Sequence, residues 1–359
     1  MIDVIIPAYN SHKTIERTLM SLGFQRASKQ LVVTIIDDGS DDTYDYLEPF
    51  FKKFFKGFNI IRLEENHGVG YARQIAIKNT KMPWIYFLDS DDVMNGVYAF
   101  NHLAIGALST PDVAMVFGKI SCELSPYANN VQAPDLFCDE EGNMQYLHGK
   151  LYSRVFIMQH GLTFPDTRCN EDIAFNLAYF TLCDSKQIVR MTHSVCTTLY
   201  NSESITRNKK STRVYSRTNV NEVYDSYRAC LHAFKQVRLN LGNNLSPTSC
   251  SLFIEKYVNL FLNGVLSNFE TDEERELYHM IITLFYRDIV KPIMNVNGIS
   301  RVLDEEYVKN GPFNYWGDAA YTRRRPKISD WSEGHLRGFD QSRFYELQEK
   351  FLTGRGYLE

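Results

Sequence analysis

Short apolar runs that alternate with helical patterns constrain the fold of this chain more than any other feature. The runs are Ile2–Ile6, Leu31–Ile36, Phe58–Leu63 and Trp84–Leu88, with a fifth expected at Val113–Phe117. After the first run, Ile15, Leu19 and Leu22 recur at the spacing of an amphipathic helix. Continuous apolar strands alternating with helices predict an α/β fold: a Rossmann-like, mostly parallel sheet with helices on both faces.

Polar clusters follow three of these strands, and ligands of such sheets bind at the carboxyl ends of the strands. The clusters are Pro7–Asn10, Asp37–Asp42 and Asp89–Asp92. Within the last one, alternate carboxylates can converge on a divalent cation, which prefers oxygen ligands. Taken alone, the cluster equally fits a solvated Asp-rich turn. The three clusters together favour a site for a nucleoside diphosphate, with an aromatic side chain at the base and a metal at the phosphates.

The later part of the chain differs from the first part. From about residue 214 the sequence becomes helical, with apolar residues at three- and four-residue spacing. We therefore expect one domain over residues 1–210 and a mainly helical C-terminal region over residues 211–359, which would bind the acceptor or mediate oligomerisation.

Composition excludes several classes of protein. The net charge of -4 excludes nucleic-acid binding by overall charge, although a local basic patch remains compatible with it. The seven cysteines form no CxxC pair, which argues against a zinc knuckle and a disulfide framework and predicts a reducing, cytoplasmic location. No apolar stretch has the length needed to cross a bilayer, so no integral membrane association is expected.

Four motifs, in order and spacing, resemble the family 2 glycosyltransferases, which have the GT-A fold and transfer a sugar from a nucleotide-sugar with inversion. The motifs are Val4–Asn10, Ile36–Asp42, Asn66–Arg73 and Phe87–Asp92. Weaker matches continue to about residue 206, at Gly149–Arg154, Glu171–Phe175 and Ser204–Arg207. The resemblance covers roughly residues 1–120, and the helical C-terminal region resembles no family that we can name.

The resemblance implies a role for each matching residue. Donor-binding roles, commonly to uridine diphosphate, fall on Pro7, Ala8, Tyr9, Asp38, Arg73, Asp89, Ser90 and Arg207. Within this set, the first three and Asp38 correspond to the grip on the base, and Arg73 corresponds to a basic side chain near the ribose or phosphates. Asp91 corresponds to the ligand of Mn2+ or Mg2+.

The resemblance also implies a general base. Inverting transfer needs one group that deprotonates the acceptor hydroxyl as it attacks the anomeric carbon. Asp172 matches that residue, at the predicted start of a helix; alternatively, Glu171 and Asp172 only favour the first helical turn.

Two assignments are less specific. His193 would supply a third metal ligand, although a lone histidine after a strand is more often an ordinary hydrogen-bonded residue. Arg207 begins a run of five basic residues, which would close over the diphosphate, meet an anionic acceptor or form a solvated helix face. The shorter run Arg323–Arg325 has the same ambiguity.

The sequence thus predicts a metal-dependent inverting glycosyltransferase that uses a nucleoside diphosphate sugar, with Asp172 as its base. Its acceptor would be a glycan or, as an alternative, a hydroxylated base in modified DNA. A non-catalytic nucleotide-sugar-binding protein is a second alternative. A nicotinamide enzyme is disfavoured because Gly68-Val69-Gly70 lacks the third glycine of the dinucleotide motif.

Overall fold

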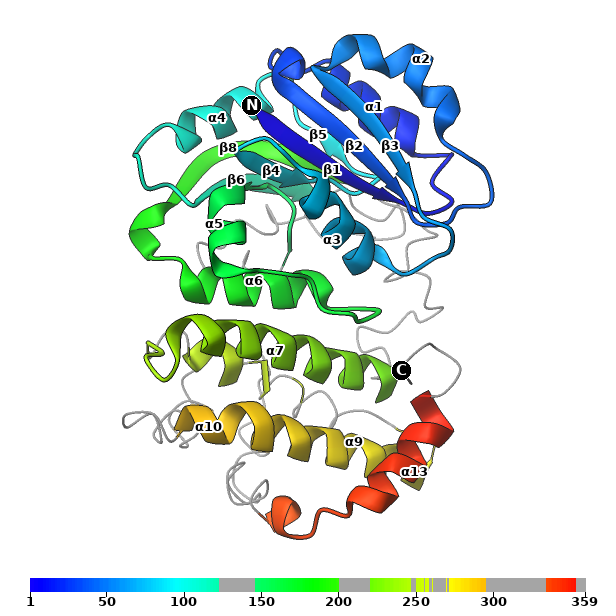
Figure 1. The fold of residues 1–359 in the computed structure, drawn as a ribbon, viewed down its shortest axis with the longest axis vertical. Coiled ribbons are helices and arrows are strands. Elements are labelled where there is room, and N and C mark those ends of the chain that lie inside the picture. The colour runs from blue at the N-terminus through cyan, green and yellow to red at the C-terminus, as the bar shows by residue number, and fades with distance from the viewer. Residues whose placement is uncertain are drawn as a thin grey trace, which may run out of the picture. The chain divides into compact units, whose positions relative to one another are not determined.

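The structure, a computed structural model, describes residues 1–122, 146–199, 220–246, 250–254, 256–257, 260, 269, 271–294 and 334–352. The chain forms two compact units, Met1–Lys210 and Ser211–Glu359. Figure 1 shows a sheet with helices in the first unit and helices in the described part of the second.

The first unit is built on an eight-stranded sheet in the order β3-β2-β1-β4-β7-β6-β8-β5. Its strands are β1 (Ile2–Ala8), β2 (Leu31–Asp37), β3 (Gly57–Arg62), β4 (Trp84–Phe87), β5 (Val93–Met94), β6 (Met115–Cys122), β7 (Lys150–Ser153) and β8 (Ile188–Thr198). The pairings β1–β2, β1–β4, β2–β3 and β6–β8 are parallel. The pairings β4–β7, β6–β7 and β5–β8 are antiparallel, so the predicted parallel core is joined to a mixed half.

Helices cover both faces of the sheet because its central strands are apolar on both sides. The helices of the first unit are α1 (Ile15–Gly23), α2 (Glu48–Phe51), α3 (Val69–Asn79), α4 (Ala99–Ala107), α5 (Arg154–His160) and α6 (Glu171–Leu182). On one face, Val4 and Ile6 of β1 pack in a core with Leu19 of α1 and Phe100 of α4. On the other face, the Phe87 ring lies 6.0 Å from that of Phe175 in α6. This second face carries α3, α5 and α6 (Figure 1).

Short 3₁₀ turns complete the first unit, at Ser28–Gln30, Asp45–Leu47, Lys52–Phe54 and Ser185–Gln187. Helix α5 has clear local signals at both ends. The Ser153 hydroxyl accepts a hydrogen bond from the Phe156 amide at its start, and Gly161 ends it with φ +60°.

The second unit consists of helices in its described part. They are α7 (Val220–Leu241), α9 (Asp272–Phe285), a π-helical turn at Tyr286–Val290, α10 (Lys291–Met294) and α13 (Gln341–Leu352). Aromatic rings fill its core: the Phe285 ring lies 6.1 Å from Tyr227 and 5.6 Å from Tyr257. Across the described part of the chain, none of the helices combines the length and the apolar character needed to cross a membrane.

Candidate functional site

The carboxyl ends of β1, β2 and β4 meet at one edge of the sheet, as the sequence predicts. The Asp38 amide donates to the Ala8 carbonyl at 2.9 Å, and the Ser90 hydroxyl donates to the Ser11 hydroxyl at 2.8 Å. Pro7 and Ala8 are buried, whereas the neighbouring Tyr9 is 51% exposed and is available to a ligand. Six of the predicted donor residues therefore lie along this edge: Pro7, Ala8, Tyr9, Asp38, Asp89 and Ser90.

Asp38 has a structural partner at this edge. Its carboxylate oxygens accept hydrogen bonds from the amides of His67, at 2.9 Å, and Gly68, at 2.8 Å. Gly68 has φ +95°, a backbone conformation that favours glycine, and α3 begins directly after it. Asp38 thus fixes the start of α3. Each of its carboxylate oxygens retains a lone pair that can accept a further hydrogen bond.

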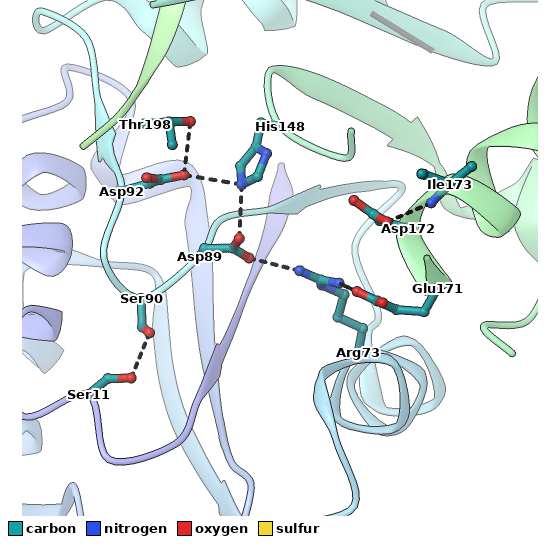
Figure 2. Close-up of polar contacts among 10 residues, drawn as sticks. All are labelled: Ser11, Arg73, Asp89, Ser90, Asp92, His148, Glu171, Asp172, Ile173 and Thr198. Atoms are coloured by element: carbon teal, nitrogen blue, oxygen red, sulfur yellow. Dashed lines mark hydrogen bonds and ion pairs between the residues drawn. The ribbon is translucent and has the colours of Figure 1, made fainter. Parts of the chain in front are cut away.

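A histidine joins two of the acidic residues after β4. The Nε2 atom of His148 lies 3.0 Å from Oδ2 of Asp89 and 3.1 Å from Oδ2 of Asp92 (Figure 2). Asp92 is buried and also accepts a hydrogen bond from the Leu199 amide at 3.1 Å. This cluster therefore joins the segment after β4 to the segment before β7 and the residue that follows β8.

The electrostatics of this cluster favour a charged histidine. Burial alone would lower the pKa of His148, but the carboxylates of Asp89 and Asp92 outweigh it and raise the pKa to about 10. Burial opposes the ionisation of Asp89, yet the cations His148 and Arg73 hold the pKa of its carboxyl well below its usual range. Burial raises the pKa of Asp92, and His148 offsets only part of that increase.

The same three residues have the geometry of a metal site. One ligand atom from each of Asp89, Asp92 and His148 lies within 4.8 Å of the other two. Two carboxylates and an imidazole are a ligand set that divalent cations such as Mn2+ accept. The residues present therefore fit a bound divalent cation, which would displace the proton that His148 holds in its absence.

Arg73 links Asp89 to the start of α6. Its Nη2 atom donates to Oδ1 of Asp89 at 2.8 Å, and its Nη1 atom donates to Oε1 of Glu171 at 2.8 Å (Figure 2). The arginine is only 4% exposed. The two carboxylates therefore hold the pKa of Arg73 above its ordinary value despite burial.

Asp172 lies beside this link, in the first turn of α6. It is half-buried, and its Oδ1 atom accepts a hydrogen bond from the Ile173 amide at 2.7 Å. Burial raises the pKa of Asp172, while Arg73, the Ile173 amide and His148 oppose the increase. Burial, with the like charge of Asp172, raises the pKa of Glu171 to about 7. The two acids of the motif therefore differ: Glu171 pairs with Arg73, and Asp172 faces the charged network (Figure 2).

A buried lysine adds a further charge near Asp172. Lys150 has no exposed surface, its ammonium donates to the Tyr146 carbonyl, and its Nζ atom lies 4.7 Å from the centre of the Phe117 ring. Burial lowers the pKa of Lys150 to about 7, although the negative charge of Asp172 counteracts that decrease.

Three predicted site residues are not placed in this network. Asp91 is half-buried, and its carbonyl accepts a hydrogen bond from Arg17 at 3.2 Å, but it is not part of the Asp89–Asp92–His148 cluster. His193 is exposed on β8 and stacks on His102 of α4 with ring centres 3.8 Å apart, so it too lies outside that cluster. Arg207, with the basic run that it begins, and Arg323–Arg325 lie outside the described residues.

Comparison with known sequences finds a family that resembles the first part of the chain. Residues 3–150 match the sequence model of a family described as Glycosyl transferase family 2. This part of the chain, the family 2 region, is similar to the glycosyltransferases of family 2.

Curated relatives resemble the family 2 region over a limited length. The uncharacterized glycosyltransferase YfnE of Bacillus subtilis is 39% identical over 89 residues, which are 24% of this chain and 22% of that protein. The poly(ribitol-phosphate) beta-N-acetylglucosaminyltransferase TarS of Staphylococcus aureus is 37% identical over 95 residues, which are 26% of this chain and 16% of that protein. The matches thus span about a fifth or less of the length of these two relatives.

A solved structure supports the fold over a longer stretch. The crystal structure of S. aureus TarS 1-349 in complex with UDP-GlcNAc has a TM-score of 0.63 and 16% identity. The similarity covers 86% of this chain and 91% of that one. The predicted fold, a GT-A sheet followed by a helical C-terminal region, is therefore confirmed.

Two members of the charged network, Asp92 and His148, were not predicted as site residues from the sequence. Asp92 was within a recognised motif but received no role, and His148 directly precedes the Gly149–Arg154 match. The position of His148 next to a family match was the available signal. Its contact with Asp89 spans 59 residues of sequence, which local spacing cannot reveal.

Proposed function

We propose that this chain is a metal-dependent inverting glycosyltransferase that moves a sugar from a UDP-sugar to an acceptor hydroxyl, with Asp172 as the general base. One observation carries the proposal. Through Glu171 and Arg73, the helix turn that bears Asp172 is tied to Asp89 at the carboxyl end of β4. A candidate base and a candidate donor site thereby belong to a single charged network.

The donor would bind along the edge formed by β1, β2 and β4. Tyr9, which is exposed, would flank the base, and Asp38 would accept a hydrogen bond from the base. A uridine nucleotide is supported by the TarS structure, which holds UDP-GlcNAc. Arg73 and Arg207 remain predicted donor contacts, and the described structure gives Arg73 two carboxylate partners instead.

A divalent cation, Mn2+ or Mg2+, would be held by Asp89, Asp92 and His148, whose ligand atoms already converge. Asp91 remains a predicted ligand from the adjacent position, and His193 a predicted third ligand. A bound cation would supply positive charge that stabilises the diphosphate as a leaving group.

The chain's own residues would carry the proton transfer. Asp172 accepts the proton of the acceptor hydroxyl as the oxygen attacks the anomeric carbon from the face opposite the diphosphate. The Ile173 amide and the nearby cations favour the ionised carboxylate that this role needs, whereas burial opposes it. The raised pKa strengthens Asp172 as a base relative to an ordinary aspartate.

The acceptor would be a glycan. The TarS relative is named for transfer to poly(ribitol-phosphate), and another match is named a teichoic acid poly(glycerol phosphate) polymerase of Staphylococcus epidermidis. No described residue and no such name supports modified DNA as an acceptor. A cytoplasmic location remains a prediction from the scattered cysteines.

A donor panel tests the proposal and separates it from non-catalytic binding. The chain is incubated with UDP-glucose, UDP-N-acetylglucosamine and GDP-mannose, with and without Mn2+, and released nucleotide is measured. We expect Mn2+-dependent release from a UDP-sugar. Binding without release from every donor, at any metal concentration, would favour a non-catalytic nucleotide-sugar-binding protein.

Calorimetry identifies the metal ligands. Asp91→Asn and Asp92→Asn each remove one carboxylate, and UDP binding is titrated with and without Mn2+. We expect both variants to lose the Mn2+-dependent part of the affinity and to lose transfer. Unchanged Mn2+ dependence in Asp91→Asn alone would assign the site to the Asp89–Asp92–His148 cluster, and unchanged dependence in both would reject this metal site.

A further inference from the structure

Helix α3 packs directly against the segment that leads into α6. A Cβ atom at Gly70 would lie 3.0 Å from Cγ of Glu171 and 3.2 Å from the Pro165 carbonyl oxygen. One turn later, the side-chain oxygen of Gln74 accepts a hydrogen bond from the Phe164 amide at 2.9 Å. The start of α6 is therefore held against one face of α3.

Arg73 lies on that same stretch of α3 and reaches two carboxylates from distant parts of the chain. Its partners, Asp89 and Glu171, are 16 and 98 residues away in sequence, and both contacts measure 2.8 Å. Its guanidinium carbon also lies 5.9 Å from the centre of the Phe164 ring. A planar guanidinium presents donors in a fixed fork, so the two carboxylates are held in a defined relative orientation.

We propose that Arg73 is a positioning residue that sets the base-bearing turn of α6 in register with the donor-side carboxylate of Asp89. The inference rests on the proposed function, because it assigns Asp172 the role of base. Asp172 follows Glu171 directly, so the orientation of Glu171 fixes where the helix turn carries Asp172. Arg73 would thereby hold Asp172 at a defined position relative to the donor site.

Burial separates this role from the direct donor contact that the family resemblance implies. Arg73 is 4% exposed, and each of its terminal nitrogens already donates to a carboxylate. By contrast, Tyr9 on the same edge is 51% exposed. A side chain with so little accessible surface acts on the reaction through Asp89 and Glu171.

Arg73→Lys tests the proposal, because lysine keeps the charge but replaces the rigid fork by a single ammonium. We expect kcat for transfer to fall about 10²-fold, the loss typical of a misplacement of about 1 Å, with UDP affinity changed less than about threefold. The ratio of transfer to donor hydrolysis should fall as well, since water needs less precise alignment than an acceptor. A role confined to stability would leave the ratio and the turnover of folded molecules unchanged.

Two further variants make the test specific. Glu171→Gln removes the charge that Arg73 holds, so it should reproduce part of the loss, and the double variant should lose less than the product of the two single effects. Arg154→Lys is the matched control: this half-buried arginine on α5 donates to the Thr80 carbonyl at 3.1 Å and is outside the network, so transfer should stay at the parent rate.

The outcomes distinguish this inference from the proposed function. If the parent chain transfers no sugar from any donor, the proposed function fails. If the parent transfers sugar but Arg73→Lys weakens UDP binding more than tenfold with kcat unchanged, Arg73 is a donor contact and the positioning role is wrong. Multiplicative effects of Arg73→Lys and Glu171→Gln would also overturn it, and should Arg73→Lys not fold, Glu171→Gln alone must show the fall in kcat.

Discussion

Asp3 and Asp89 lie at opposite ends of the central strands of the first unit, and they are held in different ways. At the amino end of β1, Asp3 accepts hydrogen bonds through one oxygen from the amides of Lys81 and Met82, at 2.9 and 2.7 Å. At the carboxyl end of β4, Asp89 is held by the side chains of Arg73 and His148. The carboxylate of Asp3 is therefore hydrogen-bonded by backbone amides, and that of Asp89 by charged side chains.

The difference separates a structural role from a functional one. The amides that bind Asp3 belong to the connection between α3 and β4. They hold its carboxylate with main-chain groups, which carry no charge that a ligand could pair with. The charges around Asp89 come from α3, from the segment before β7 and, through Arg73, from α6. Such buried charges are costly to desolvate and are weak stabilisers, so their convergence at one edge indicates a site.

The largest expected effect is at the base. Asp172→Asn keeps the size of the side chain but cannot take a proton, so kcat for transfer should fall about 10²–10⁴-fold while UDP affinity stays near that of the parent. Glu171→Gln should lose less, because the two side chains leave the helix roughly 100° apart and only one can face the anomeric carbon. Steady-state kinetics with calorimetry measures both. A dead Glu171→Gln beside an active Asp172→Asn would make Glu171 the base.

A smaller effect on kcat is expected when the pH is changed. Burial raises the pKa of Asp172, so more of this base is protonated in mildly acidic solution than for an exposed aspartate. Because only the ionised form acts as a base, kcat should rise about tenfold per pH unit below this pKa and level off above it. A parent profile that falls as pH rises through the acidic range would contradict the assignment.

The smallest effect on catalysis is expected at Asp3, at the opposite end of the central strands. Asp3→Ala leaves the amides of Lys81 and Met82 without their acceptor, which should destabilise the fold by about 1–3 kcal/mol. The turnover of the molecules that remain folded should match the parent. Thermal unfolding and active-site titration measure the two quantities separately. If Asp3→Ala lost as much turnover as Asp172→Asn, the assignment of a purely structural role to Asp3 would be wrong.

The sequence predicted the parallel half of the sheet well. The apolar runs at residues 2–6, 31–36 and 84–88 correspond to β1, β2 and β4, because a strand buried on both faces is apolar throughout. The strands of the mixed half of the sheet were harder to predict from the sequence. Strand β8 carries Arg190, Thr192 and His193 and shows no apolar run, and the four-residue β7 begins with a buried lysine. Both join the sheet through long-range pairing, which local patterns do not encode.

The candidate site was predicted in part. Residues next to strand ends, such as Ala8, Asp38 and Ser90, lie together because parallel strands bring their ends to one edge. The ion pairs of Arg73 and His148 were not predictable from spacing, since each requires packing between elements distant in sequence. Sequence therefore indicated which residues gather at the edge, and packing determined which of them pair.

The anomeric configuration of the sugar product tests the central claim most directly. The donor is a UDP-sugar with an α-linked sugar, and proton NMR follows the released or transferred sugar at early times, before mutarotation. A single displacement with Asp172 as base predicts the β-anomer as the first product. An α-configured first product would mean retention and would contradict the inverting mechanism.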